Sequence, residues 1–256
     1  MNDWYDLTKH YDLSFSHEME DEVSFIRAIL EKYFGPHKVK ILEPACGTGR
    51  LLFPLSTSNI DYTGFDINTN SIEFLKNKIE RMGISARAFV SDMTDFKVTG
   101  SKFDCAICTV DTFRHLMTET EALAHFICMA KHLKKNGLYI LGLHLLPAQG
   151  YSEKVIPWET SSGGQKLFTS ISVLNVDRKK RIETLKILFR SKRGKNIRKH
   201  RSIYHLRTYT YRQFFNLLKK AACFDIIEAY DYSYDMGHPI VLNSQTEDAM
   251  LVLRKI

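Results

Sequence analysis

The sequence predicts an α/β fold in which a mostly parallel sheet carries an inserted antiparallel β-meander. Val39, Ile41 and Leu42 form a near-continuous apolar run that leads through an acid into a small-residue turn, which is the pattern of a strand covered on both faces. Strand-like and helical patterns alternate from there to residue 147. Between residues 166 and 208, turn-like basic segments separate three runs that are rich in β-branched and aromatic residues.

The chain has 256 residues, and this length and its composition fit one large domain with an elaborated insertion. No apolar run reaches the ~18 residues of a membrane span, and the N-terminus does not resemble a signal peptide, so we expect a cytoplasmic protein without a membrane partner. The five cysteines are an odd number without framework spacing, which fits reduced thiols. Cys105 and Cys108 lie in an apolar run with no second ligand pair, so we expect no metal.

The N-terminal region predicts an amphipathic helix that runs to Phe34 and ends at Gly35 and Pro36, because apolar residues recur at helical spacing. The segment before it is aromatic: Trp4, Tyr5, Tyr11 and Phe15. These side chains either cover the core or fold over a bound ligand, and the second alternative is what the family resemblance given below implies.

The turn after the first strand predicts a ligand site. Ala45, Gly47 and Gly49 let a ligand approach the backbone amides at a helix start, and Arg50–Thr57 should form a short helix with Pro54 in its first turn. A dinucleotide site fits poorly, because Leu52 occupies the third glycine position. Glu43 at the strand end would repel a pyrophosphate.

Acidic residues follow three predicted strands at the same sheet edge: Glu43, Asp66 and Asp92. Ligands of open α/β sheets bind at this edge, outside the carboxyl ends of the strands. A capping box of Asn70 and Glu73 should start a helix over 70–82, which Gly83 closes.

The second half of the core predicts a further helix and strand. Thr118 and Glu121 should cap a helix over 119–135, and the fifth strand should cover 138–147. His144 near its end is a candidate general base or a histidine hydrogen-bonded beneath the sheet edge. Asp111 in the preceding loop is a weaker candidate for substrate contact.

Residues 148–206 should form an inserted antiparallel lid or substrate subdomain, while 1–147 and 207–256 form the core. Residues 178–201 hold twelve Lys or Arg and one acid, Glu183, which gives this segment a formal charge of +11. The chain then returns to the core through a helix capped by Thr210 and Gln213 and through strands at 224–230 and 249–256.

Four motifs in this order resemble those of the class I S-adenosylmethionine (SAM) dependent methyltransferases. They are EPACGTGR (43–50), YTGFDIN (62–68), FVSDM (89–93) and FDCAICTVDTFRHL (103–116). The resemblance covers roughly residues 36–146. A weaker one, LRTYTYRQFFNLLKKAACF (206–224), is similar to relatives that act on small molecules. The resemblance to this family implies a Rossmann-like sheet of seven strands with the last strand antiparallel.

The resemblance also implies how SAM and its product S-adenosylhomocysteine would be held. Asp66 would bind the ribose hydroxyls, Asp92 the adenine amine, and Met93 a ring nitrogen and the purine face. Glu43 and Tyr11 would reach the methionine end. The remaining implied contacts come from the same motifs: Ala45, Cys46, Gly47, Gly49, Arg50, Ile67, Cys108 and Phe113.

Three functions stay open at this point. The first is methyl transfer to a nitrogen or oxygen atom of a small molecule by direct displacement, in a monomer or homodimer. The second is methylation of RNA or another polyanion that binds the basic 178–201 segment. The third is SAM binding without catalysis, since methyl transfer needs no side-chain nucleophile. Chemistry alone requires a base only if the acceptor must lose a proton before it attacks.

Overall fold

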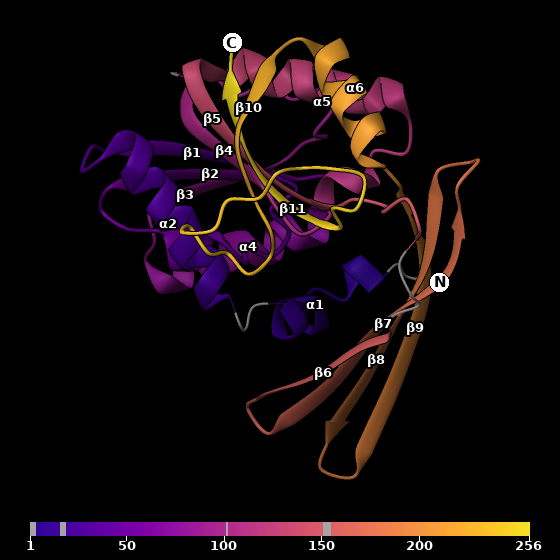
Figure 1. Cartoon of the computed structure of the whole chain (residues 1–256). Helices are drawn as coiled ribbons and strands as arrows, with labels where there is room; N and C mark the ends of the chain where they lie inside the picture. The colour runs from indigo at the N-terminus through magenta and orange to yellow at the C-terminus, as the bar shows by residue number, and fades with distance from the viewer. Residues whose placement is uncertain (1–3, 16–18, 101, 151–154) are drawn as a thin grey trace.

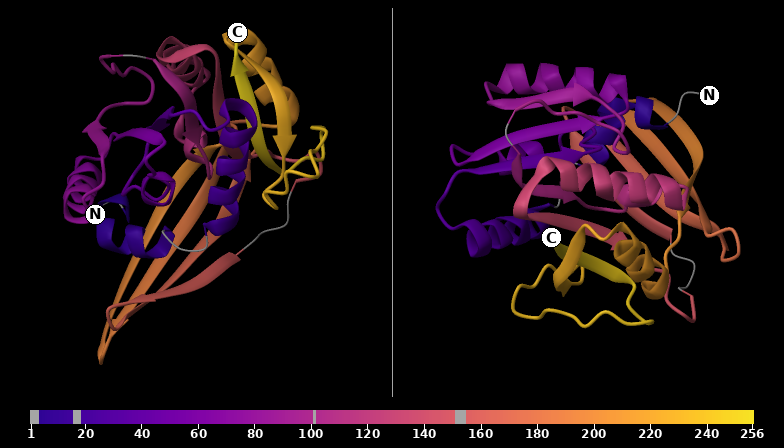
Figure 2. Two further views of the ribbon diagram at one scale, coloured as in Figure 1. Left: turned by 90° about the vertical axis from the view of Figure 1, so that its left-hand side faces the viewer. Right: turned by 90° about the horizontal axis from the view of Figure 1, so that it is seen from above.

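A central seven-stranded sheet carries helices on both faces, and a separate four-stranded sheet projects from it (Figure 1). The computed structural model describes residues 4–15, 19–100, 102–150 and 155–256. The left view of Figure 2 shows the four-stranded sheet narrowing to a tip beyond the core.

The central sheet has the order β10-β11-β5-β4-β1-β2-β3. Its strands are β1 (Val39–Pro44), β2 (Ile60–Asp66), β3 (Ala86–Val90), β4 (Phe103–Cys108), β5 (Leu133–His144), β10 (Phe224–Tyr230) and β11 (Asp248–Lys255). Only β11 runs antiparallel to its neighbours in this sheet, β5 and β10. The predicted seven-stranded sheet with an antiparallel last strand is confirmed.

The helices form two layers. On one face, α5 (Glu119–His132) and α6 (Tyr211–Ala221) pack through Phe126, Met129 and Phe214. On the other, α2 (Glu20–Phe34), α3 (Leu52–Leu55) and α4 (Thr69–Met82) pack through residues such as Ile29 and Leu75. The short elements η1 (Trp4–Asp6), α1 (Thr8–Phe15) and η2 (Thr112–His115) lie near the strand ends that face the second sheet.

The helix starts follow local capping chemistry. The predicted capping boxes of α5, at Thr118 and Glu121, and of α6, at Thr210 and Gln213, are present. The N-cap of α4 was predicted at Asn70, two residues too late. Asn68, which follows the strand end at once, accepts a hydrogen bond from the Ser71 amide at 2.9 Å and caps the helix.

The predicted end of α5 was also wrong. The helix stops at His132, and β5 begins at Leu133 instead of 138. Phe103 pairs with Leu133 but Cys105 pairs with Leu138, so the intervening residues bulge from the ladder. Asn136, with φ 60°, therefore turns the chain within the strand and does not close the helix.

The inserted sheet has one strand more than predicted. β7 (Gln165–Asp177), β8 (Ile182–Arg193) and β9 (Asn196–Arg207) match the three predicted runs, and β6 (Val155–Ser162) adds an edge strand. The strand β6 was not predicted because it contains Pro157, and proline argues against a strand in a sequence pattern. An edge strand tolerates proline because one side of it donates no ladder hydrogen bonds. The inner face of this sheet buries Leu167, Ile187 and Phe189 against Trp4.

We predict that Gly49→Ala destabilises the protein by about 2 to 4 kcal/mol, through both backbone and packing. Gly49 has φ +85°, and a Cβ there would lie 2.5 Å from Leu75 Cδ1 and 2.9 Å from a Phe53 ring carbon. Gly194→Ala is the matched control, because Gly194 has φ +58° with nothing within 4 Å of its Cβ position. Urea denaturation of both variants checks this, and equal losses would contradict the packing contribution.

Candidate active site

A cavity of about 980 Å³ lies between the carboxyl ends of the central strands and the inner face of the second sheet. Its floor comes from residues at or just after the carboxyl ends of β1 to β5. Its other walls come from the aromatic N-terminal segment and from the second sheet: Trp4, Tyr5, Tyr11, Phe15, Trp158, Ile171, Leu185 and Tyr204. Helix α1 joins the two sides, since Asp12 pairs with Lys78 of α4 at 2.9 Å and Ser14 hydrogen-bonds Thr169 of β7 at 2.7 Å.

Asp66 is fixed by backbone amides at the end of β2. Its Oδ2 accepts from the Gly47 amide and its Oδ1 from the Asn68 amide, both at 2.8 Å. Burial raises its pKa, and the amide hydrogen bonds oppose that shift. Gly47 has φ +53°, and a Cβ there would lie 3.5 Å from the Tyr11 ring, so a bare backbone faces the cavity. A carboxylate has about four acceptor positions, so Asp66 can still receive hydroxyl protons.

Glu43 is buried beside this turn. The Tyr62 hydroxyl donates to its Oε2 at 2.7 Å, and burial raises the pKa of the carboxyl to about 8. It is therefore mostly protonated at neutral pH unless a cationic group binds next to it. Arg50, on the same loop, donates to Glu22 of α2 and to Thr109 Oγ1 at 3.0 Å.

The loop after β3 is ordered by its own side chains and by α5. Asp92 Oδ1 accepts from the amide and the hydroxyl of Thr94, each at 2.7 Å. The Met93 carbonyl accepts from His125 Nδ1 at 2.9 Å. Burial lowers the pKa of His125 to about 4, so the neutral ring donates from Nδ1 and accepts the Tyr139 hydroxyl at Nε2.

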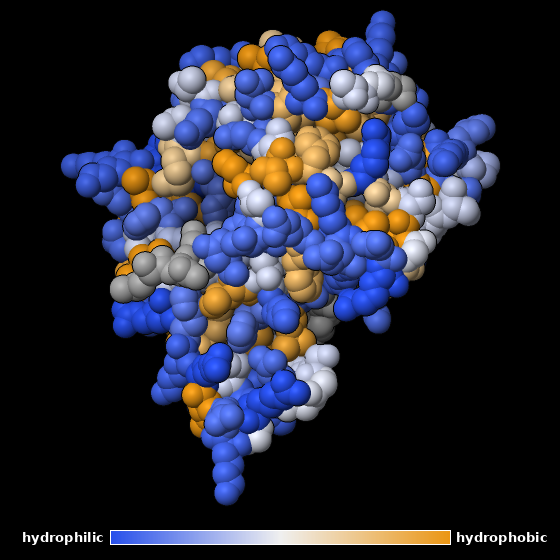
Figure 3. All heavy atoms as spheres, turned by 180° about the vertical axis from the view of Figure 1, so that it is seen from behind, coloured by the Kyte–Doolittle hydropathy of each residue, from blue (hydrophilic) through white to orange (hydrophobic). Residues whose placement is uncertain are grey.

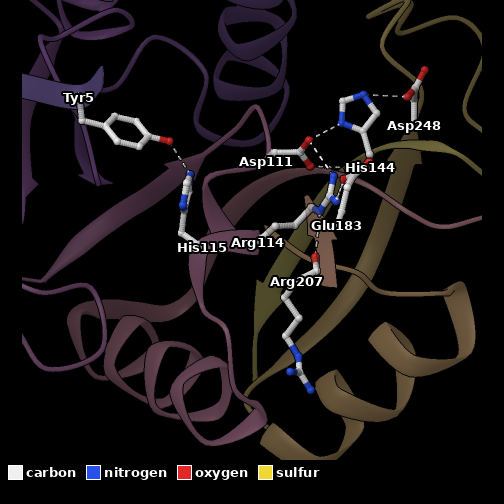
Figure 4. Close-up of polar contacts among 8 residues, drawn as sticks. All are labelled: Tyr5, Asp111, Arg114, His115, His144, Glu183, Arg207 and Asp248. Carbon is white, nitrogen blue, oxygen red and sulfur yellow. Dashed lines mark hydrogen bonds and ion pairs between the residues drawn. The ribbon is translucent and has the colours of Figure 1, made fainter. Parts of the chain in front are cut away.

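The loop after β4 is strained and carries a chain of charges (Figure 4). Val110 and Asp111 both have left-handed φ, 52° and 64°, a conformation that costs about 1 to 3 kcal/mol per residue and concentrates at functional sites. This turn brings Asp111 to the end of β5, where Oδ1 accepts from the His144 amide at 2.8 Å and Oδ2 lies 2.6 Å from His144 Nδ1.

Charged partners extend this chain in both directions. His144 Nε2 lies 3.2 Å from Asp248 Oδ1, and Arg114 Nη1 lies 2.9 Å from Asp111 Oδ2. Arg114 also pairs with Glu183 of β8 and donates to the Arg207 carbonyl at 2.9 Å.

These partners shift the pKa values of the two central groups in opposite directions. Burial alone would raise the pKa of Asp111, but Arg114 and His144 hold it well below its usual range. Burial alone would lower the pKa of His144, but Asp111 and Asp248 raise it.

Most of the predicted site residues line this one cavity: Tyr11, Glu43, Ala45, Cys46, Gly47, Arg50, Asp66, Ile67, Asp92, Met93, Cys108, Asp111 and His144. Gly49 and Phe113 are not among its lining residues. Gly49 packs under the turn against Leu75, and Phe113 is fully buried against Phe126 and Tyr209.

Sequence reasoning missed Arg114 and Glu183, which join the two sheets, and Asp248, which lies beside His144 within the central sheet. Each is an ordinary charged residue in its local sequence. The alternation of side chains along β8 could have revealed Glu183, because this acid occupies the same face of the strand as the apolar residues that point inward.

Comparison with known proteins gives a consistent assignment. Residues 41–137 match the family described as "Methyltransferase domain". A protein of Geobacillus sp. (strain WCH70) that is named a methyltransferase is 29% identical over 121 residues, which are 47% of this chain and 49% of that protein. The chain thus spans about half the length of the curated relatives it matches.

Solved structures resemble the whole chain. A SAM-dependent methyltransferase from Clostridium acetobutylicum ATCC 824 has a TM-score of 0.76 at 17% identity and covers 99% of both chains. SAM-bound CalS10, described as an amino pentose methyltransferase from Micromonospora echinaspora, has a TM-score of 0.71 at 16% identity, over 92% of this chain and 91% of its own. At these identities the likeness concerns the fold. Residues 41–137 thus match a methyltransferase domain, and the chain as a whole has the fold of SAM-dependent methyltransferases.

Proposed function

We propose that this protein transfers the methyl group of SAM to a nitrogen or oxygen atom of a small molecule by direct displacement. The observation that carries the proposal is the cavity described above, which runs from the acids at the ends of β1 to β3 to the aromatic wall made by η1, α1 and the second sheet. Such a cavity can hold a cofactor and an acceptor side by side away from bulk water.

The residues of the cofactor half fit SAM. The two amide hydrogen bonds on Asp66 hold its carboxylate for a ribose diol, and the bare backbone at Gly47 leaves room beside Tyr11. Asp92 and Met93 would take the adenine, and Glu43 and the Tyr11 hydroxyl the methionine end. Bound there, SAM supplies an electrophilic methyl group on a sulfonium.

The chain's own contribution is chiefly positional. The aromatic wall and the second sheet orient the acceptor, and well-held reactants gain up to about 7 to 11 kcal/mol from proximity and orientation. A small acceptor is also supported by the amino pentose methyltransferase among the structural neighbours.

The position of the charges favours this substrate class over a polyanion. Glu183 and Leu185 line the cavity, so Lys186 and Arg190 point to the opposite face of the second sheet, and Lys192, Arg193 and Lys195 lie exposed at the hairpin tip. Figure 3 shows this projecting end covered mostly by hydrophilic residues. The cavity itself is lined by more carboxylates than cations, which opposes phosphate entry.

For the cofactor, we predict that Asp66→Ala weakens binding of SAM and of S-adenosylhomocysteine by roughly ten- to hundred-fold, since charge-assisted hydrogen bonds are worth about 1.5 to 3 kcal/mol. Asp61→Ala, at the other end of β2, is the control and should bind both normally. Isothermal calorimetry on folded samples measures this. A wild-type protein that binds no SAM would refute the proposed function.

For the basic segment, we predict weak RNA binding that is unrelated to catalysis. A polyanion site would show affinity that falls steeply with salt, with a log–log slope of about 0.7 per phosphate contacted on a single strand. Filter binding across a salt series tests this. Submicromolar affinity that is lost on neutralising Lys192, Arg193, Lys195, Arg198 and Lys199 would favour the RNA enzyme.

For the pair of His144 with Asp111, we predict that His144→Gln is less stable than the wild type by about 1 to 2 kcal/mol, because the charged hydrogen bond is lost. The loss is modest because the His144 side chain is 35% exposed and solvent screens its charge. The folded pKa of His144 is raised, so the gap is full below the ordinary value of 6.5 and shrinks as pH rises through the raised value. Urea melts between pH 5.5 and 9 check the sign. A gap that grows with pH would contradict the charged pair.

A further inference from the structure

A buried histidine attaches the loop that would hold the adenine to helix α5. The loop consists of residues 91–94, which follow β3, and all four line the cavity. His125 is fully buried on α5, and its Nδ1 lies 2.9 Å from the carbonyl oxygen of Met93. This contact joins the floor of the cavity to the helix layer on one face of the sheet.

The Met93 carbonyl fixes the direction of the hydrogen bonds around this ring. A carbonyl oxygen only accepts, so Nδ1 is the donor. Burial lowers the pKa of His125 to about 4, so the ring is neutral and its Nε2 accepts from the Tyr139 hydroxyl at 2.7 Å. The Phe113 ring packs edge-on against the imidazole, with the ring centroids 5.6 Å apart. His125 is therefore held in one tautomer and one orientation.

The hydrogen bond from His125 reaches Asp92 through a single peptide unit. The carbonyl of Met93 and the amide of Thr94 belong to the same planar group. The Thr94 amide donates to Asp92 Oδ1 at 2.7 Å, and the Thr94 hydroxyl donates to the same oxygen at 2.7 Å. A rotation of this peptide would break the bonds at both of its ends. His125 thus fixes the Asp92 carboxylate as well as the backbone at Met93.

The two groups that are oriented in this way match one edge of a 6-aminopurine. Its exocyclic amine donates hydrogen bonds, and the neighbouring ring nitrogen N1 accepts one. A carboxylate and a backbone N–H at a fixed spacing would therefore read both. A site built for a ligand N–H rejects an analogue that lacks it, because the groups of the site are then left unpaired.

We propose that His125 is a positioning residue for the cofactor, which sets the preference of the site for a 6-aminopurine base by holding the peptide between Met93 and Thr94. The inference rests on the proposed function, in which Asp92 and Met93 take the adenine. His125 is not among the residues that line the cavity, so it acts through these two.

The test compares two ligands that differ only at this edge of the base. They are S-adenosylhomocysteine and S-inosylhomocysteine, in which a carbonyl oxygen replaces the amine. Isothermal calorimetry on folded samples measures the binding of both. In the wild type we expect S-adenosylhomocysteine to bind about ten- to hundred-fold more tightly. His125→Leu keeps apolar bulk without a donor, and it should reduce this preference to about three-fold or less.

Two amide variants separate the donor from the packing of the ring. The side-chain nitrogen of His125→Asn can lie near the position of Nδ1, so this variant should keep most of the preference although it loses the contact with Phe113. The amide of His125→Gln lies near the position of Nε2, toward Tyr139, so this variant should lose the preference. This pair decides the question even if His125→Leu does not fold. Equal loss in both amide variants would overturn the donor role.

His132→Leu is the matched control. His132 lies about two turns further along α5, where Nδ1 donates to the Cys128 carbonyl at 2.9 Å and Nε2 accepts from the Val98 amide at 3.3 Å. It does not line the cavity, so this variant should keep the wild-type preference.

Three outcomes would overturn the role of His125 and leave the proposed function intact. They are a preference that survives in both His125→Leu and His125→Gln, a preference that His132→Leu also removes, and equal binding of the two ligands by the wild type. Failure of the wild type to bind S-adenosylhomocysteine would overturn both proposals.

Discussion

The buried guanidinium of Arg114 is the contact on which the arrangement of the two sheets depends. Its side chain is 3% exposed and lies between Asp111 on the strained loop, Glu183 on β8 and the carbonyl of Arg207 on β9. A buried ion pair adds little net stability, but loss of one partner leaves an uncompensated charge that costs about 3 to 5 kcal/mol. The pairing therefore specifies where the second sheet sits over the strand ends, and thereby the shape of the cavity.

The central sheet could be predicted from sequence because its signals are local. The apolar run of β1, the turn at Gly47 and the acids after β1, β2 and β3 all lie within a few residues of the strands that position them. The rule that strand ends share one edge then placed Glu43, Asp66 and Asp92 together. The sequence left open whether the aromatic N-terminal side chains contact a ligand or cover the core. Trp4 is placed for both, since it packs on Phe189 and lines the cavity.

Other parts of the site depend on contacts that no local pattern encodes. Asp248 follows a polar loop and meets His144 only because β11 pairs with β5. The end of α5 was mispredicted because Asn136 and Gly137 look like a helix stop, whereas pairing with β4 extends β5 back to Leu133. Phe113 lies in a cofactor motif, yet the 3-10 turn of η2 directs its ring into the core beneath α5 and α6.

The direction of β11 has a consequence for the dynamics of the site. Because this strand runs opposite to its neighbours, its first residue, Asp248, reaches the edge where the parallel strands end. Residues 249–253, which follow at once, are fully buried, and residues 250–253 pair with strands on both sides. Amides in such strands exchange with solvent only when the whole domain opens. Asp248 and His144 are thus anchored directly to this buried ladder, and their spacing is set before any ligand arrives.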